Sequence, residues 1–184
     1  MASLHKARQA LFSFLEENGI DYKTHTHPPV FTVEESRSIK ADLPGAHTKN
    51  LFLKDKAGAL FLICAEAQTQ IAINKLHKVL GCKRLSFGTA EQMENCLGVS
   101  PGSVTLFGLI NDMPTDRSEG RGEEKGTRVT LILDKRLTQY DRVNFHPLKN
   151  DATTAISAQN MIRFATLTGH TPLIMDFSQL GSTQ

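Results

Sequence analysis

The chain has 184 residues and a formal net charge of +2, with 40% hydrophobic and 22% charged residues. Length and composition predict one soluble globular domain over residues 1–184 and exclude a disordered, collagen-like or disulfide-rich chain. No apolar run reaches the length of a membrane span, so no membrane partner is expected. The small net charge neither demands nor forbids a nucleic-acid partner.

Cysteine and histidine usage favours a metal-free protein. Cys64, Cys82 and Cys96 are widely spaced, form no C-x-x-C pair, and follow an N-terminus without the apolar core of a signal peptide. This pattern favours reduced thiols and a cytoplasmic location. His25 and His27 could bind a metal on a strand, but no third ligand follows them, so no metal or cofactor is predicted.

The first half of the chain mixes helical and strand-like patterns. In chain order we expect a helix over residues 2–18, an extended segment over 21–27, a helix over 33–40, strands over 46–54 and 59–65, and a helix over 71–80. Gly19 ends the first helix, and Thr32 with Glu35 is typical of a capping box for the second. The short connection at residues 55–58 predicts a hairpin between the two strands.

The second half continues without a regular strand–helix rhythm. We expect a short helix from Thr89 to Gly98, a strand over 104–110, an exposed glycine-rich loop over 116–126, strands over 128–133, 143–145 and 152–157, a helix over 158–168, and a strand over 173–177. Thr89 and Gln92 form a second capping-box match. The irregular order and the hairpin-like connections predict an α+β domain with a mixed or antiparallel sheet.

Lys49 is the first candidate functional residue. Side chains alternate along a strand, so Lys49, Leu51 and Leu53 share one face of the strand expected over 46–54. Burying an ammonium group costs free energy unless it meets an anion, which makes Lys49 a candidate for binding one. The structural alternative is a lysine at the sheet rim that extends to water.

Three further patterns have both a functional and a structural interpretation. The loop from Gly98 to Gly102 could present N–H groups to an oxygen, or it could be an ordinary turn. His146 could act as a general base or hydrogen-bonding group in a site, or it could be a structural histidine. A basic stretch contains Lys75, Lys78, Lys83 and Arg84. These cations could bind a phosphate backbone or form a solvated helix face.

Six motifs occur in order: HPPVFTVEE (27–35), TKNLFL (48–53), LGVSPGSV (97–104), FGLIND (107–112), NFHP (144–147) and NDATTAI (150–156). Together they resemble the YbaK/prolyl-tRNA-synthetase-associated domain family, above all its freestanding bacterial ProX-type editing branch. The resemblance covers residues 5–177. It implies a compact α+β fold with a mixed, barrel-like sheet flanked by helices.

The resemblance also implies an activity. Such proteins hydrolyse the ester that joins a wrong amino acid to tRNA, usually alanine on tRNA(Pro), and cysteine or other amino acids in sister branches. This ester is already activated, and a vicinal hydroxyl of the terminal adenosine can help to activate water. No metal, cofactor or protein nucleophile is then required. The expected partners are mischarged tRNA(Pro) and, transiently, prolyl-tRNA synthetase.

The resemblance places Lys49 and the Gly98–Pro101 loop in the site, and the other site residues are hypotheses that fit the same chemistry. The expected catalytic residues are Lys49, Gly98, Pro101 and Gly102, with loop N–H groups stabilising the oxyanion. The expected substrate-binding residues are Val30, Phe31, Asn50, Ser100, Leu106, His146 and Asn150. Val30, Phe31 and Leu106 would limit the pocket to amino acids smaller than proline. The basic stretch would meet the acceptor stem. Leu106 departs from the family pattern, which often has proline there, and this affects loop shape and amino-acid preference.

Other functions remain open on the sequence alone. A non-catalytic module could hold tRNA or a synthetase without hydrolysis, and a hydrolysis assay separates it from a deacylase. A hydrolase of other acyl esters would not need the tRNA. A DNA-binding regulator is not expected, because no helix-turn-helix with a basic recognition helix is visible.

Overall fold

The computed structural model describes residues 2–30, 33–114 and 127–181. Its α-helices are α1 (Ala2–Glu17), α2 (Val33–Ala41), α3 (Ile73–Leu80), α4 (Ala90–Leu97) and α5 (Ala158–Leu167). Its strands are β1 (Tyr22–Thr26), β2 (Ala46–Asp55), β3 (Leu60–Glu66), β4 (Leu85–Phe87), β5 (Val129–Asp134), β6 (Arg142–Phe145), β7 (Ala152–Ser157) and β8 (Leu173–Met175). Short 3-10 helices are η1 (Leu106–Asp112), η3 (Lys135–Gln139) and η4 (Phe177–Gly181).

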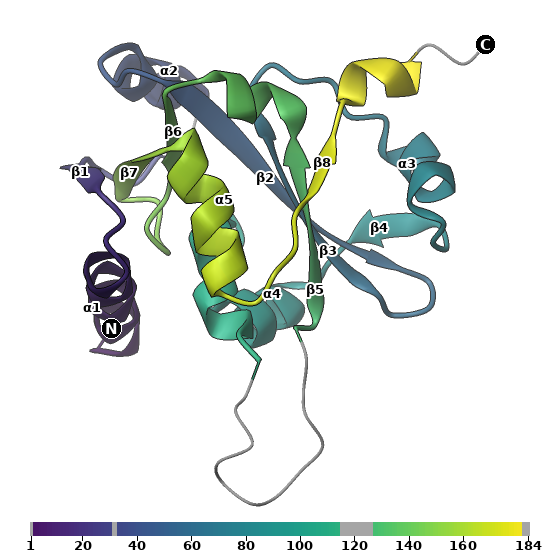
Figure 1. Ribbon diagram of the computed structural model, residues 1–184, viewed down its shortest axis with the longest axis horizontal. Helices are drawn as coiled ribbons and strands as arrows, with labels where there is room; N and C mark the ends of the chain where they lie inside the picture. The colour runs from purple at the N-terminus through teal and green to yellow at the C-terminus, as the bar shows by residue number, and fades with distance from the viewer. Residues whose placement is uncertain (1, 31–32, 115–126, 182–184) are drawn as a thin grey trace, which may run out of the picture.

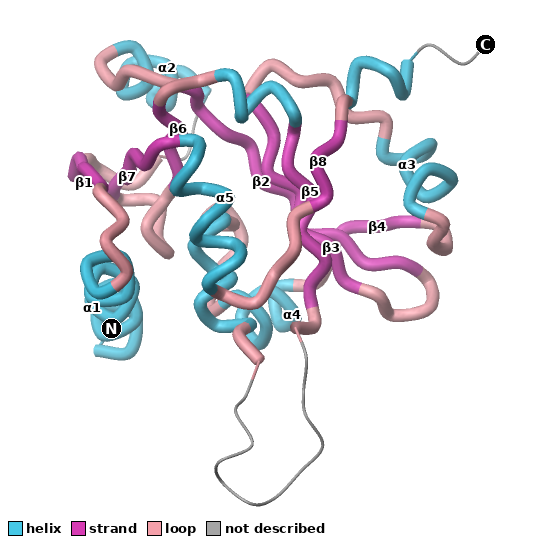
Figure 2. The backbone as a smooth tube through the Cα atoms, viewed as in Figure 1, coloured by secondary structure: helices cyan, strands magenta, loops and turns pink. Residues whose placement is uncertain are grey.

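The strands form one mixed sheet in the order β1-β7-β6-β2-β3-β5-β8, with β4 paired to β2. Strand β2 joins the two halves of this sheet (Figures 1 and 2). Its first residues, Ala46 and His47, pair in parallel with β6, and the rest of the strand pairs antiparallel with β3. The predicted α+β domain with a mixed sheet flanked by helices is therefore confirmed.

Strand β3 is buried on both faces. Leu62 and Cys64 belong to the main core with α1, α4, η1 and α5, whereas Ile63 and Ala65 face a second core that contains Leu76 of α3. A strand covered on both sides explains the uninterrupted apolar run over this segment. The predicted alternation of β2 is also confirmed, because Leu53 lies in the second core and the partly buried Leu51 packs against it.

Most of the expected elements are present, and one was wrong. The strand expected over 104–110 is instead the 3-10 helix η1. The side chain of Thr105 accepts a hydrogen bond from the Phe107 N–H at 3.3 Å and starts this helix. A Cβ on Gly108 would lie 2.8 Å from the Cβ of Leu97, so the glycine permits close packing of η1 on α4.

Capping residues were predicted more accurately. Thr89 and Gln92 form the expected reciprocal capping box at the start of α4, and Gly81 and Gly98 end α3 and α4 in the left-handed conformation. The Thr32 capping residue and the loop over 116–126 lie outside the described residues. Within the described part of the chain, no helix is long and apolar enough to cross a membrane.

Candidate functional site

A cavity of about 340 Å³ lies where α2 packs over β2, β6 and β7. We call it the histidine cavity. Three imidazoles line it, together with one lysine, several polar groups and an apolar wall. These residues are His27, His47, His146, Lys40, Ser36, Thr48, Asn144, Thr153, Val30, Ile39, Leu43 and Phe145.

Two of the imidazoles are held by backbone carbonyls. The Nε2 atom of His47 lies 3.0 Å from the carbonyl oxygen of Leu43, and the Nδ1 atom of His146 lies 2.9 Å from that of Ala152. A carbonyl only accepts hydrogen bonds, so each of these nitrogens carries the proton. In the neutral tautomer, Nε2 of His146 keeps a lone pair that can accept a hydrogen bond.

The third imidazole connects the cavity to the sheet. His27 lies 2.8 Å from the Pro28 carbonyl through Nδ1 and 2.9 Å from the Thr153 hydroxyl through Nε2. Its ring centroid lies 6.2 Å from that of His146, in an edge-to-face arrangement. The strand pair β1–β7 and the β6–β7 hairpin therefore bring these two imidazoles together.

Burial favours the neutral form of His47 and His146. Desolvation lowers the pKa of His146, and the nearby His27 and Lys40 lower it further, which outweighs its bond to the Ala152 carbonyl. Desolvation also lowers the pKa of His47. At neutral pH both rings are therefore uncharged, as a hydrogen-bond acceptor or general base requires.

Amides fix the chain around the cavity. The side chain of Asn144 donates to the carbonyls of Pro44 and Ala46 at 3.0 and 3.1 Å, which ties β6 to the start of β2. The amide of Asn150 donates to the carbonyl of Val30 at 3.2 Å. Asn150 thereby holds the segment that carries an apolar residue of the cavity wall.

Asn50 does not line the cavity but contacts a residue that does. Its amide nitrogen donates to the Thr48 hydroxyl at 3.3 Å, and that hydroxyl donates to the Asn144 carbonyl at 2.8 Å. The Asn50 Oδ1 atom is buried, and it has no hydrogen-bond partner among the described residues. Asn50 therefore reaches the cavity through Thr48.

The structure brings only part of the expected site together. Val30 and His146 line the histidine cavity, and Asn150 holds Val30. Phe31 lies outside the described residues. Leu106 is fully buried in the main core and does not line the cavity.

Lys49 has a protein partner. Its ammonium group donates to the carbonyl of Thr69, in the loop that leads to α3. Lys49 does not line the histidine cavity, but it stands two residues after His47 and so shares a face of β2 with it. The expected anion contact therefore stays a prediction.

The loop expected to hold an oxyanion lies apart from this cavity. Gly98, Ser100, Pro101 and Gly102 follow α4, and Figure 1 shows α4 at a different edge of the molecule from α2. The Gly98 N–H already donates to the Glu94 carbonyl at 3.0 Å, and a Cβ on this glycine would lie 2.5 Å from Asn111. The structure thus gives Gly98 a packing role and leaves its catalytic role untested.

The basic stretch is exposed, as expected of a nucleic-acid contact or of a solvated face. It comprises Lys75, Lys78, Lys83 and Arg84 on α3 and the turn after it. Figure 1 shows α3 at the opposite side of the sheet from α2. The cations therefore do not border the histidine cavity.

Sequence reasoning missed Lys40 and His47 as site residues and considered His27 only as a metal ligand. Their assembly depends on α2 packing over β2 and β6, which no local pattern reveals. Among the described residues, no group of three or more His, Cys, Asp or Glu side chains could hold a metal ion.

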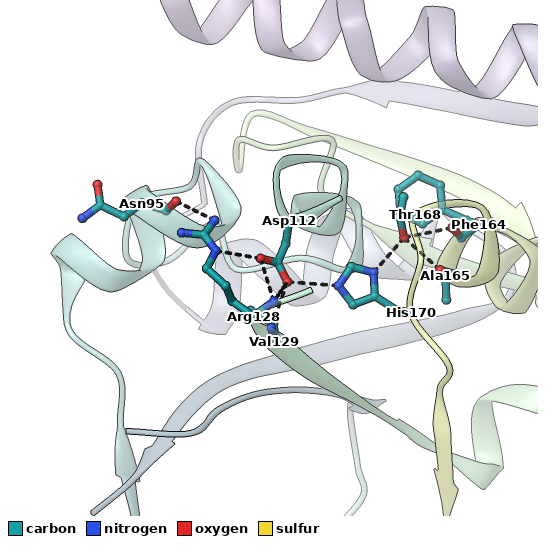
Figure 3. Close-up of polar contacts among 8 residues, drawn as sticks. All are labelled: Asn95, Asp112, Arg128, Val129, Phe164, Ala165, Thr168 and His170. Atoms are coloured by element: carbon teal, nitrogen blue, oxygen red, sulfur yellow. Dashed lines mark hydrogen bonds and ion pairs between the residues drawn. The ribbon is translucent and has the colours of Figure 1, made fainter. Parts of the chain in front are cut away.

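A second polar cluster has the order of a catalytic triad but is buried. Asp112 contacts Nε2 of His170 at 3.1 Å, and Nδ1 of His170 lies 3.0 Å from the Thr168 hydroxyl (Figure 3). Thr168 is 0% exposed, and its hydroxyl also donates hydrogen bonds to the carbonyls of Phe164 and Ala165. A substrate cannot reach that hydroxyl, so the cluster is structural.

Comparison with known proteins agrees with the resemblance found in the motifs. Prolyl-tRNA synthetase associated domain-containing protein 1 of Danio rerio is 36% identical over 172 residues, which cover 92% of this chain and 87% of that protein. Prolyl-tRNA editing protein ProX of Acetoanaerobium sticklandii is 30% identical over 166 residues, with 90% and 94% covered.

The fold is also found among solved structures. One described as a candidate trans-editing enzyme for prolyl tRNA synthetase superposes with a TM-score of 0.64 at 17% identity, covering 92% of this chain and 96% of that one. The aminoacyl-tRNA editing domain family matches residues 27–164, a range that contains every residue of the histidine cavity. The chain therefore belongs to the aminoacyl-tRNA editing domain family.

Proposed function

We propose that this protein is a trans-editing deacylase that hydrolyses the aminoacyl ester of mischarged tRNA, with Ala-tRNA(Pro) as its substrate. The observation that carries the proposal is the histidine cavity inside the family-matched range, with neutral imidazoles beside an apolar wall. The relative ProX carries prolyl-tRNA editing in its name. These observations support ester hydrolysis on a tRNA substrate.

The chemistry needs a positioned water rather than a protein nucleophile. The lone pair on Nε2 of His146 can accept a hydrogen bond from the water or from the vicinal hydroxyl of the terminal adenosine. Lys40 borders the same cavity and adds positive charge to it, and the family resemblance assigns the cation that stabilises the developing negative charge to Lys49. Water attacks the ester carbonyl, the bond to the ribose oxygen breaks, and the free amino acid and the tRNA hydroxyl are released.

Amino-acid choice would depend on the apolar wall. Val30, Ile39 and Leu43 lie on the side of the cavity formed by α2 and the segments that precede and follow it. Their bulk would leave room for the methyl group of alanine and obstruct the ring of proline. A difference of a few methylene groups is worth only about 1–3 kcal/mol in such a pocket.

We expect the purified protein to release alanine from Ala-tRNA(Pro) at least about tenfold faster than proline from Pro-tRNA(Pro). The measurement is deacylation of both esters and of Cys-tRNA(Pro), each labelled in the amino acid. Faster release of cysteine would keep the deacylase and refute the alanine assignment. Intact esters with retained tRNA binding would refute the deacylase and leave a non-catalytic module.

Because burial lowers the pKa of His146, activity should persist into mild acid. We expect kcat/KM to stay level down to the ordinary histidine pKa of 6.5 and to fall only below it, as His146 becomes protonated. The pH–rate profile of wild type and His25→Gln, whose histidine is exposed on β1, should coincide. A fall centred above pH 6.5 would contradict a buried neutral base.

The acceptor stem would extend away from the cavity. The exposed basic stretch on α3 remains a proposed contact for it, and the aromatic ring of Phe87 on the adjacent β4 is 61% exposed. Cations beside an exposed ring are typical of a surface that binds a nucleic-acid backbone. A transient contact with prolyl-tRNA synthetase is likewise part of the proposal, supported by the names of the relatives.

A further inference from the structure

The loop over residues 147–151 lies between β6 and β7 and is tied to three lining residues of the histidine cavity. It follows His146 directly. The amide of Asn150 donates to the Val30 carbonyl at 3.2 Å, and the carbonyl of the last loop residue accepts the His27 N–H at 3.0 Å. We call this segment the support loop, because any shift of it would move all three lining residues.

The backbone of the support loop is strained at its second residue. Leu148 has a φ of +68°, in the left-handed region that residues with a side chain rarely adopt. Its N–H donates to the His146 carbonyl at 2.9 Å, and its side chain is buried in the main core. Such a conformation costs free energy and persists only where surrounding contacts hold it. The support loop therefore needs a restraint from outside.

Arg8 of α1 supplies a restraint of this kind. Its Nε donates to the Pro147 carbonyl at 2.9 Å, and one of its Nη atoms donates to the Lys149 carbonyl at 3.4 Å. The same Nη atom pairs with the Asp151 carboxylate. The guanidinium thus bonds to the residues on both sides of Leu148. Its planar group holds these donors in fixed directions, which a lysine ammonium does not do.

We propose that Arg8 is a positioning residue of the active site, which clamps the support loop so that His146 keeps a constant orientation toward the ester. The inference rests on the proposed function. Arg8 does not line the histidine cavity, so it acts through the loop rather than on the substrate. Figure 1 shows α1 at the same edge of the molecule as β1 and β7. This helix precedes the family-matched range, so the clamp is an addition to the matched domain.

The clamp also places a charge pair close to the His146 ring. Titratable groups face this ring from the elements around it. They are His27, Lys40, His47 and Asp151. Desolvation has the largest effect on the pKa of His146 and lowers it, whereas the Asp151 carboxylate raises it.

Arg8 compensates the charge of this carboxylate. Burial raises the pKa of Asp151, but the hydrogen bond and the charge of Arg8 outweigh it, so the carboxyl group stays ionised. The other cation on Asp151 is Lys149, at 3.5 Å, whose side chain is 51% exposed. Without Arg8 the negative charge would act more strongly on the imidazole of His146. The clamp therefore has an electrostatic readout at the cavity as well as a geometric one.

The test compares wild type, Arg8→Met and Arg8→Lys in the full chain. The matched control is Arg163→Met, because Arg163 is an exposed arginine of α5 that donates to the Gly19 carbonyl after α1. The pKa of His146 is measured by NMR titration of its ring protons, with the signal assigned by His146→Gln. This measurement needs no turnover. Deacylation of Ala-tRNA(Pro) gives kcat and KM, and melting curves verify folding.

We expect the His146 ring of Arg8→Met to bind a proton at least about twofold more tightly than that of wild type, which raises its pKa. Asp151→Asn should shift this pKa in the opposite direction. Because the loop is no longer held, kcat of Arg8→Met should fall about tenfold, with little change in KM. Arg8→Lys keeps the charge and should restore the pKa of His146, but it should not restore the full kcat.

The outcomes separate this inference from the proposed function. An unchanged kcat and an unchanged pKa of His146 in Arg8→Met would overturn the positioning role, even if wild type hydrolyses Ala-tRNA(Pro). Equal losses of kcat in Arg8→Met and Arg163→Met, without a shift in that pKa, would also overturn it and leave Arg8 a merely structural residue. A shifted pKa in a protein that hydrolyses no ester would support the coupling of Arg8 to the cavity and refute the deacylase.

Discussion

Replacing Asp112 with alanine is expected to lower the free energy of unfolding by about 3–5 kcal/mol, because it leaves several donors around a buried carboxylate unpaired, at about 1–3 kcal/mol for each buried one. The carboxylate is 3% exposed as a residue and lies at the end of η1. It accepts hydrogen bonds from the Val129 N–H at 2.9 Å and from the Arg128 N–H and Nε, and it contacts His170 (Figure 3). These donors belong to β5 and to the segment before β8, so one side chain ties three parts of the chain together.

Electrostatics give this prediction a pH dependence. Burial alone would raise the pKa of Asp112, but the hydrogen bonds from His170, Val129 and Arg128 outweigh it and lower the pKa below the ordinary 3.8. The contribution of the ionised Asp112 carboxylate to the free energy of unfolding is therefore complete above the ordinary pKa of 3.8. This contribution is lost as the pH falls through the lowered pKa of the folded protein. The advantage of wild type over Asp112→Ala should persist at pH 5.

Urea unfolding at pH 7 and pH 5 measures the effect. The free energy of unfolding of Asp112→Asn should lie between those of wild type and Asp112→Ala. One side-chain oxygen still accepts a backbone hydrogen bond, whereas the new NH₂ group faces the N–H donors that the second oxygen of Asp112 accepted from. The matched control is Asp176→Ala, whose carboxylate also accepts a backbone N–H, from Ser178, but at the surface. A similar loss of stability for Asp112→Ala and Asp176→Ala would show that burial of the Asp112 carboxylate is unimportant.

The sequence predicted the fold well wherever local patterns decide the structure. The capping box of Thr89 and the uninterrupted apolar run of β3 each have a local cause, and both expectations were correct. The error at η1 has a non-local cause. Val104-Thr-Leu-Phe107 has strand-like composition, and the 3-10 helix depends on Gly108 packing against Leu97 of α4.

The candidate site was predicted less completely for the same reason. His146 was found because it lies in a motif, and the structure places it in the cavity. Lys40 and His47 lie in different elements, and they border a common cavity only because α2 covers the junction of β2 and β6. Leu106 seemed a pocket wall on sequence grounds, whereas its burial in the core fits the apolar packing of η1 on α4.

Two lysines near the site, Lys49 and Lys40, are alternative candidates for the cation that acts on the substrate. The resemblance points to Lys49, which is partly buried and anchored on the Thr69 carbonyl. Geometry points to Lys40, which borders the histidine cavity from α2. Partial burial lowers the pKa of Lys40, and the charge of Glu66 partly offsets this.

We expect Lys49→Ala to reduce kcat/KM for Ala-tRNA(Pro) by about 100-fold or more, the usual effect of losing a pre-oriented donor to a developing charge. Lys49 shares a face of β2 with His47, which lines the histidine cavity, so we propose that its ammonium exchanges the Thr69 carbonyl for an oxygen of the substrate. Lys40→Ala should reduce kcat/KM by no more than about fivefold, because an exposed ion contact is worth at most about 1 kcal/mol.

Steady-state deacylation of the two variants measures the difference, with Lys54→Ala as the matched control. Lys54 lies on the same strand, but the alternation of side chains puts it on the other face; its backbone is in register with Leu60 of β3 and Ser86 of β4. A normal rate for Lys49→Ala with a large loss for Lys40→Ala would transfer the site cation from β2 to α2. Similar small losses for all three lysines would show that the ester is hydrolysed without a fixed cation, by the imidazoles and the adenosine hydroxyl alone.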